Sequence, residues 1–451
     1  MGRVYRIIDL ITGNDMLWKN DIAAPNGANN ALKWWLWIGG IEYTLPGQEH
    51  GYTWALQWNW NIVDQRDNRD DRDNRATRTT TTDDSDNYDV LSDYQYCAEG
   101  NLCVVTTVTE PTTGMIETLS FSLSNTSSAL STEIFLYNPS STETVQYAHW
   151  TNVPFVPGPL NTIPDTTEFI IPTQTIHIDK RWQENLGNET QNWKTSPLRY
   201  IKNWTNGTKM GDLTSNGLEH GYFGVYSHSN SEDSNTDNSE EEEEEEGRRR
   251  QLDVGGLRLF NLTTTPGCDT WTYGYHPPSC FPQYKKIAVG HCRYAEMWGG
   301  TVTHLEKVKP LKPKENIHWN EFVLSYRGTR GVTFANNYFV ANVWREKEKN
   351  NVAVVALSFH QEMSGISVSV EGGYSKSSGG GGVLSDLHYV GDVTPSKVVL
   401  VEEYMMYDDD DDNDDNDDER LLANGVKRVL RVLVWSEEGM KVLVGSFAAQ
   451  V

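Results

Sequence analysis

A chain of 451 residues is long enough to bury a large core, in one large β domain or a few ordinary ones. Its formal net charge is −25, but four polar tracts carry −20 of it, so the rest of the chain is nearly balanced. No basic stripe compensates the acidic balance, which excludes nucleic acid as the expected partner. A calcium-binding or basic-partner role of the acidic tracts stays open.

Short strand-like segments dominate the chain, and convincing amphipathic helices are almost absent. They are rich in Val, Ile, Thr, Tyr and Trp and bounded by Gly, Pro, Asn and Ser, which is typical of strands. This pattern predicts an all-β fold, a large antiparallel sandwich or barrel. In chain order, the expected strands are residues 4–10, 102–108, 116–123, 133–137, 144–150, 168–171, 256–262, 286–289, 317–326, 338–343, 352–359, 366–370, 397–401, 426–435 and 440–445.

Charged or low-complexity runs interrupt these strands. They cannot bury apolar area, so they are interpreted as disordered loop insertions, at about residues 64–89, 229–251, 374–384 and 407–420. A further charged run near residues 344–351 suggests a domain boundary. We therefore expect a main domain at 1–345, followed by a smaller β unit, or the completing strands of the main sheet, at 346–451.

The cysteine spacing and the hydropathy pattern limit which metal sites, disulfides and membrane spans are expected. The five cysteines contain no CxxC pair, so we expect neither a metal nor a cofactor. Loop disulfides between Cys97 and Cys103 and between Cys268 and Cys280 are possible pairings that the odd count does not decide. No apolar run reaches ~18 residues, so no membrane span is expected. Five N-x-[ST] sequons are compatible with secretion, a cytoplasmic location is the alternative, and the oligomeric state is open.

The densest cluster of chemistry-bearing residues is GGIEYTLPGQEHGYTWALQWNW, at positions 39–60. It places Glu42 and His50 among tyrosines and tryptophans. Aromatic rings stack on the C–H faces of pyranoses, carboxylates accept hydrogen bonds from hydroxyls, and His or Glu moves protons near neutral pH. The cluster is therefore typical of a sugar site. Core packing is the alternative for each tryptophan, because Trp is usually buried.

Two later segments add candidate contacts. In residues 136–158 a strand follows an Asn-Pro turn and leads to Trp150 and Asn152, which could line a cleft at the strand end. Buried structural roles are equally compatible with these two residues. In residues 220–228, HGYFGVYSH, the aromatic Tyr222 is a further candidate, and the two histidines lack the spacing that a metal site favours.

The segment YAEMW supplies a candidate proton-transfer group. Alternation along a strand puts Glu296 and Trp298 on the same face. A Glu flanked by aromatic rings has its pKa raised by desolvation, which suits it to proton transfer. Pairing with a neighbouring arginine is the alternative. Trp319 and Glu321 also share a face, consistent with a sugar-contacting strand edge.

These motifs, in this order, resemble a known family. The sequence is similar to an uncharacterised group, the domain of unknown function 5107, within the galactose mutarotase-like superfamily. The shared motifs are GxIE followed by P and HG, then NP and W-x-N, and finally Y-x-E-x-x-G-G and W-x-E. The resemblance spans about residues 2–343, with the insertions looped out. Members of that group have further β structure before the strand that corresponds to residues 1–4, so we expect a truncated N-terminus.

The resemblance implies a β-supersandwich with an open carbohydrate cleft on its concave face. Aldose epimerases of this fold protonate the ring oxygen with a His and take the anomeric proton with a Glu. It implies His50 as the acid and Glu296 as the base. The implied sugar-lining residues are Glu42, Trp150, Asn152, Tyr222, Trp298, Trp319 and Glu321.

Three functions are therefore open. The first is binding of a mono- or oligosaccharide, with or without aldose 1-epimerase activity. The second is a glycosidase or polysaccharide lyase on the same fold, for which Glu42 and Glu296 would be the carboxylate pair. The third is a non-catalytic structural or interaction protein, because one fold hosts unrelated functions.

Overall fold

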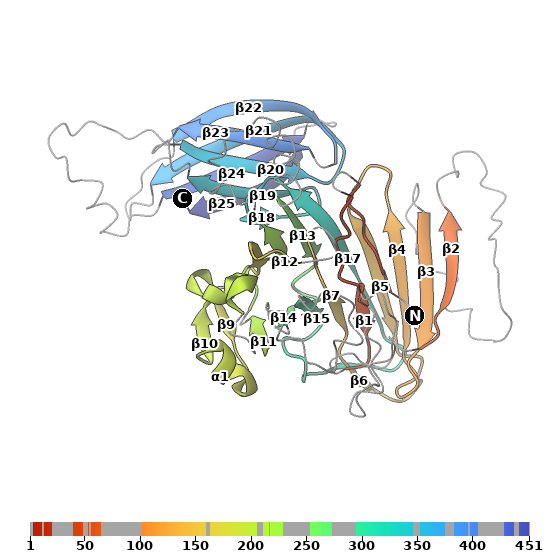
Figure 1. Ribbon diagram of the computed structural model, residues 1–451. Coiled ribbons are helices and arrows are strands. Elements are labelled where there is room, and N and C mark those ends of the chain that lie inside the picture. The colour runs from red at the N-terminus through yellow and green to blue at the C-terminus, as the bar shows by residue number, and fades with distance from the viewer. Residues whose placement is uncertain are drawn as a thin grey trace, which may run out of the picture. The chain divides into compact units, whose positions relative to one another are not determined.

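The computed structural model consists almost entirely of antiparallel strands (Figure 1). Helix is limited, in the part of the chain that is described, to the single turn α1 (Gln183–Leu186) and short 3-10 turns between residues 180 and 203. The predicted all-β fold is thus confirmed. The structure describes residues 3–10, 13–19, 39–47, 53, 56–64, 102–158, 163–204, 211–215, 217–228, 253–272, 295–345, 352–374, 383–395, 397–404, 428–436 and 442–450.

The chain divides into two compact units. The first comprises residues 1–125 and 129–325, and the second comprises residues 126–128 and 326–451. The charged run expected to mark the boundary instead connects β19 (Phe339–Arg345) to β20 (Val352–Phe359), which pair as antiparallel neighbours within the second unit. Both strands bury residues in the core of the second unit.

An eight-stranded sheet forms one layer of the first unit. Its strands alternate in burial, as residues 130–134 do, where Leu130, Thr132 and Ile134 are buried and Ser131 and Glu133 are half-buried. The order of its strands is β2 (Asn59–Asp64), β3 (Leu102–Thr109), β4 (Ile116–Leu123), β5 (Leu130–Tyr137), β17 (Asn316–Arg327), β13 (Val254–Leu259), β12 (Tyr222–Ser227) and β8 (Thr167–Ile170).

A seven-stranded sheet forms the other layer, and its strands are shorter. A two-stranded ribbon of β16 (Lys309–Leu311) and β6 (Val145–Tyr147) accompanies the two sheets. The order in the seven-stranded sheet is β1 (Glu42–Thr44), β7 (Trp150–Val153), β15 (Ala295–Gly300), β14 (Gly267–Thr272), β11 (Gly211–Ser215), β9 (Thr175–His177) and β10 (Thr190–Asn192).

The hydrophobic core of the first unit lies between these two sheets. Tyr43 and Met297 of the seven-stranded sheet belong to the same buried cluster as Leu119, Ile134 and Phe223 of the eight-stranded sheet. Face-to-face sheets bury one face each, and alternation sends every second side chain to the opposite face. The first unit is therefore an antiparallel sandwich, and each sheet has an inner face and an outer face.

The second unit is a smaller two-sheet sandwich. One sheet has the order β18 (Phe334–Ala335), β19, β20 and β23 (Val398–Tyr404), and the other has β22 (Val383–Val393), β21 (Met363–Tyr374), β24 (Arg428–Ser436) and β25 (Val442–Gln450). Alternating residues of both sheets, such as Val355 and Leu357 opposite Val368 and Val432, form one buried cluster. This unit has its own core.

Some sequence-based expectations differ from the structure. Residues 4–10 make isolated bridges rather than a strand, and the expected strand at 286–289 lies outside the described residues. Cys103 is disulfide-bonded, with its partner outside the described residues. Cys268 is a free, buried thiol, so the pairing of Cys268 with Cys280 is wrong. Burial raises the pKa of this thiol.

The expected insertions are in part described. Asp64 ends β2, β21 extends to Tyr374 and β22 begins at Val383, so two of the insertions are narrower than expected. The expected insertions at 229–251 and 407–420 fall almost wholly outside the described residues. Within the described ranges, no helix is long and apolar enough to cross a membrane, and no group of three or more His, Cys, Asp or Glu residues is placed to hold a metal ion.

Candidate functional site

The outer face of the seven-stranded sheet carries a row of polar and aromatic side chains. Glu42 pairs with Asn152, Asn152 with Trp298, and Trp298 with Asp269, each across neighbouring antiparallel strands. Directly paired residues share a face, so these four side chains lie in one row across four strands. Their strand neighbours Tyr43, Val153, Met297 and Cys268 belong to the inner-face core. We call this outer surface the polar face.

A second row extends the polar face along β14 and β15. Glu296 pairs with Trp271, two residues from Trp298 and Asp269 on the same strands. The two rows thus make an alternating arrangement of two carboxylates and two tryptophans, here called the acidic-aromatic square: Trp298, Asp269, Glu296 and Trp271. The Trp298 indole Nε1–H donates to Glu296 Oε2 at 2.8 Å, as expected if the two share a face.

The carboxylates of the polar face are buried and held. Glu42 is 3% exposed, and its Oε1 lies 3.1 Å from Arg3 Nη2. Arg3 also donates from Nη1 to the Gly39 carbonyl at 3.1 Å, which fixes the guanidinium beside Glu42. Asp269 Oδ2 accepts a hydrogen bond from the Thr214 hydroxyl at 3.1 Å. Fixed, desolvated carboxylates are strong acceptors for donors that approach them.

Trp150 and Asn152 on β7 complete the site. Trp150 is fully buried and packs with Trp298 in a small apolar cluster. Its ring lies over the backbone of Gly300, where an added Cβ would overlap the ring atoms. The Trp150 Nε1–H and the Asn152 side-chain oxygen are both buried, and neither has a hydrogen-bond partner in the structure. Buried polar atoms are nearly always satisfied, so this pair needs an explanation.

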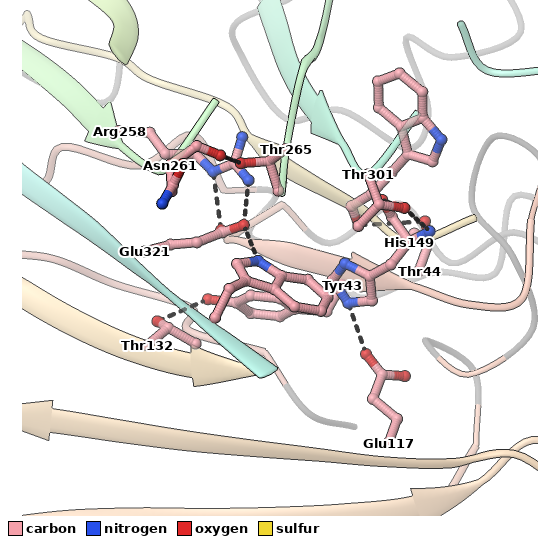
Figure 2. A network of polar contacts seen from close by, with 12 residues as sticks. Tyr43, Thr44, Glu117, Thr132, His149, Arg258, Asn261, Thr265, Thr301 and Glu321 are labelled. Atoms are coloured by element: carbon pink, nitrogen blue, oxygen red, sulfur yellow. Dashed lines mark hydrogen bonds and ion pairs between the residues drawn. The ribbon is translucent and has the colours of Figure 1, made fainter. Parts of the chain in front are cut away.

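Trp319 and Glu321 lie elsewhere, on the inner face of the eight-stranded sheet. Glu321 accepts hydrogen bonds from Arg258 Nε at 2.9 Å, from Arg258 Nη2 and from Trp319 Nε1 at 2.8 Å. Arg258 and Glu321 are 0% and 2% exposed in their side chains. Glu321 therefore belongs to a buried ion pair with Arg258 inside the sandwich (Figure 2), and Trp319 donates a hydrogen bond to it.

This ion pair is part of a larger interior network. In Figure 2, His149 Nε2 lies 2.9 Å from Glu117 Oε1, and the Tyr43 hydroxyl lies 3.1 Å from Thr132 Oγ1. The His149 ring meets Trp319 edge to face at 5.2 Å. Burial raises the pKa of Tyr43 and keeps it neutral. The interior network is defined as Tyr43, Glu117, Thr132, His149, Arg258, Trp319 and Glu321.

Tyr222, another predicted residue, is separate from the polar face. Tyr222 lies on β12 of the eight-stranded sheet, where its neighbour Phe223 faces the core, so Tyr222 points to the outer side of that sheet. Its ring stacks on His220 with centroids 5.8 Å apart, and burial raises its pKa. His50, the expected acid, lies outside the described residues. Glu42, Trp150, Asn152, Glu296 and Trp298 are the predicted residues that the structure brings together.

Three residues of the polar face were absent from the sequence-based site: Arg3, Asp269 and Trp271. The signal for Asp269 and Trp271 is present in β14, GCDTWT, where alternation puts the carboxylate and the indole on one face. The same pattern had singled out Glu296 and Trp298. Arg3 carries no such signal, because its contact with Glu42 joins positions from an irregular segment and a strand.

Comparison with known proteins gives distant similarities of fold. No protein-family profile and no curated protein matches the chain. A TPR-domain containing protein from Parabacteroides distasonis aligns with 77% of this chain at 16% identity and a TM-score of 0.49, and the chain spans about half, 47%, of that protein. A galactose mutarotase-like protein from Lactobacillus casei aligns with 72% of this chain and 94% of its own, at 7% identity and a TM-score of 0.40.

A galactose mutarotase related enzyme from Lactobacillus acidophilus gives a comparable result. It aligns with 72% of this chain and 91% of its own length, at 11% identity and a TM-score of 0.37. Identities this low carry no residue-level correspondence. We therefore base the function on the geometry of the polar face.

Proposed function

We propose that this protein binds carbohydrate on the polar face of its seven-stranded sheet. The observation that carries the proposal is the pair of buried, unpartnered polar atoms on β7, the Trp150 indole N–H and the Asn152 side-chain oxygen. They lie on the same face as the acidic-aromatic square, one strand away from Glu296 and Trp298. A buried donor and a buried acceptor left unsatisfied cost about 1–3 kcal/mol each.

A sugar hydroxyl matches this pair chemically. A hydroxyl group donates one hydrogen bond and accepts two, so a single one can accept from Trp150 Nε1 and donate to the Asn152 oxygen. The neighbouring carboxylates of Glu42, Asp269 and Glu296 are acceptors for further hydroxyls, and the partly exposed indole of Trp271 offers an apolar surface. A polyhydroxylated ligand with apolar ring faces is the chemical class that meets all of these groups.

Aldose 1-epimerase chemistry on this face is the catalytic form of the proposal. Glu296 would take the proton from the anomeric hydroxyl while His50 gives a proton to the ring oxygen. The bond between the anomeric carbon and the ring oxygen then breaks, and an open-chain aldehyde forms. Rotation and the reverse proton transfers close the ring as either anomer. Support for Glu296 is its desolvation and its fixed orientation by Trp298.

Calorimetry and polarimetry test the two parts of the proposal separately. Glucose, galactose and mannose are titrated into the protein, and mutarotation of each pure α-anomer is followed. We expect heat of binding to at least one sugar, lost in Asn152→Leu, and faster mutarotation that Glu296→Gln abolishes while binding persists. Glu143→Gln, on an exposed turn, is the matched control. No heat with any sugar, together with unchanged mutarotation, would overturn the proposal.

Glycoside hydrolysis is the second candidate, and one observation favours it. Asp269 and Glu296 are diagonal neighbours on β14 and β15, which places their Cα atoms ~7–8 Å apart. Retaining and inverting glycosidases hold their carboxylates ~5–9.5 Å apart. Glu42 is two strands from Glu296, a lateral separation of ~10 Å, so Asp269 replaces it as the partner. Release of reducing ends from oligosaccharides, without faster mutarotation, would select this function.

A further inference from the structure

The polar face continues beyond the acidic-aromatic square into a second aromatic feature. Trp182, from the 3-10 turn at Lys180–Trp182, meets Trp271 edge to face with ring centroids 5.1 Å apart and an interplanar angle of 67°. Both indoles are partly exposed. By contrast, Trp150 and Trp298, at the other end of the square, are 0% and 1% exposed.

The position of this tryptophan pair relative to the carboxylates is fixed by strand register. Trp271 lies directly opposite Glu296, on the strand farther from Asn152. The polar face therefore presents, in order, the unpartnered atoms of β7, the carboxylates of β15 and β14, and the Trp182–Trp271 pair. The step from β7 to β14 is two strand spacings, ~10 Å, which is longer than one pyranose ring.

Trp182 also has an unsatisfied polar atom. Its indole Nε1–H is buried and has no hydrogen-bond partner in the structure, although part of its ring is accessible. Edge-to-face packing covers one face of one ring, so the pair retains apolar ring surface for stacking. A partly exposed aromatic surface with an unused N–H donor is suited to a ring that carries both C–H faces and hydroxyls.

We infer that Trp182 and Trp271 form a second sugar subsite, so the ligand of the polar face is an oligosaccharide rather than a free monosaccharide. This inference rests on the proposed carbohydrate binding and adds the length of the ligand to it. The first unit of the ligand occupies the region of Asn152 and Trp298, and the next unit stacks on Trp271. Glu296, which lies between them, is then placed beside the linkage.

Titration with sugars of increasing length tests the inference. Glucose, galactose and mannose, and their β1,4- and α1,4-linked di- and trisaccharides, are titrated by calorimetry. We expect roughly tenfold tighter binding of the oligosaccharide than of its monosaccharide, since one stacking contact contributes ~1.4 kcal/mol. Trp271→Ala should remove this gain and leave the monosaccharide affinity within about twofold.

Two controls keep the result interpretable. Trp60→Ala removes a tryptophan that is 60% exposed on β2 of the other sheet, and it should leave both affinities unchanged. Trp182→Phe keeps an aromatic ring while removing the N–H donor, and it should weaken oligosaccharide binding; it serves as the test if Trp271→Ala fails to fold. Equal affinity for mono- and oligosaccharides, or an equal loss of both in Trp271→Ala, overturns the second subsite alone. Absence of binding to every sugar overturns the proposed function and the subsite together.

Discussion

The interior network and the polar face are built from the same residue types, yet they differ in where they lie in the sandwich. In the interior network, Glu321 accepts from both Arg258 and Trp319, and His149 pairs with Glu117. On the polar face, the Trp150 N–H and the Asn152 oxygen are buried without partners. Buried polar atoms without partners occur in both regions, because Arg258 Nη1, His149 Nδ1 and Glu117 Oε2 of the interior network also lack one. What separates the regions is position: the interior network lies between the two sheets, and the polar face lies on the outer side of one of them.

The two regions also differ in what surrounds them. The guanidinium of Arg258 lies over the rings of Phe223 and Phe260, with its central carbon 5.2 and 4.8 Å from their centroids. These contacts, together with the bonds from Nε and Nη2 to Glu321, compensate much of the charge of a fully buried cation. Asn152 on the polar face is enclosed as well, with 2% of its surface exposed, but no charged partner faces its side-chain oxygen. Residue type alone therefore does not separate a structural network from a binding surface.

The largest expected effect comes from breaking the interior ion pair. Glu321→Ala leaves the buried Arg258 cation unpaired, so the free energy of unfolding should fall by ~3–5 kcal/mol. Urea unfolding followed by tryptophan fluorescence measures the loss, with Glu143→Ala on an exposed turn as the control. The double variant Arg258→Met, Glu321→Leu should recover part of the stability. A loss below ~1 kcal/mol for Glu321→Ala would contradict a structural role for the pair.

A pH titration extends the comparison to the second unit. Burial lowers the pKa of His360 to about 4, from an ordinary value near 6.5. The unfolded chain then binds the proton more readily than the folded one, so stability is full above pH ~6.5 and is lost as pH falls toward 4. The loss should reach about 3 kcal/mol. His360→Leu should flatten this dependence, and an unchanged slope would show that other groups cause it.

Steric access to the polar face can be changed at one glycine. Gly300→Ala places a methyl group against the Trp150 ring, which must shift, at a cost of ~1–3 kcal/mol. We expect lower thermal stability and weaker sugar binding in the same variant. Gly47→Ala is the matched control, because its nearest contact for an added Cβ is an ordinary 3.6 Å. Unchanged sugar affinity in a destabilised Gly300→Ala variant would show that Trp150 is not part of the binding site.

The smallest expected effect on stability is at Asn152. Its side-chain oxygen has no partner to lose, so Asn152→Leu should change the free energy of unfolding by less than ~1 kcal/mol. Urea unfolding of Asn152→Leu and Glu321→Ala under the same conditions compares the two changes in the free energy of unfolding directly. A loss as large as that of Glu321→Ala would mean that Asn152 is structural, and the distinction between the two regions would fail.

The local sequence pattern was sufficient to predict many of the strands. β4 and β20 match the expected residues 116–123 and 352–359, because both are eight-residue segments rich in apolar residues that favour strands. The short strands β1, β9, β10 and β11 were not expected, since three to five residues give too little alternation to recognise. They form much of the seven-stranded sheet that carries the site.

The site itself was predictable in its local part. Glu296 with Trp298 follows from alternation within one strand, and the structure joins them by a hydrogen bond. Alternation also placed Trp319 and Glu321 on one face, but it gave no information about which face of which sheet that would be. Only pairing between distant strands decides this, and register is a tertiary property. Asp269 was missed although its strand carries the same pattern.

Adjacent glycines of β15 have a consequence for the mutational history of this protein. Gly299 lies under the Arg258 guanidinium on the inner face, and Gly300 lies under the Trp150 ring on the outer face. Two large side chains thus pack against one strand from opposite sides. At each of the two glycine positions there is no room for a substituent larger than hydrogen. In a saturation library, we expect these positions to tolerate fewer substitutions than the carboxylates beside them. Selection for folding alone would then preserve this strand in descendants that had lost the function of the face.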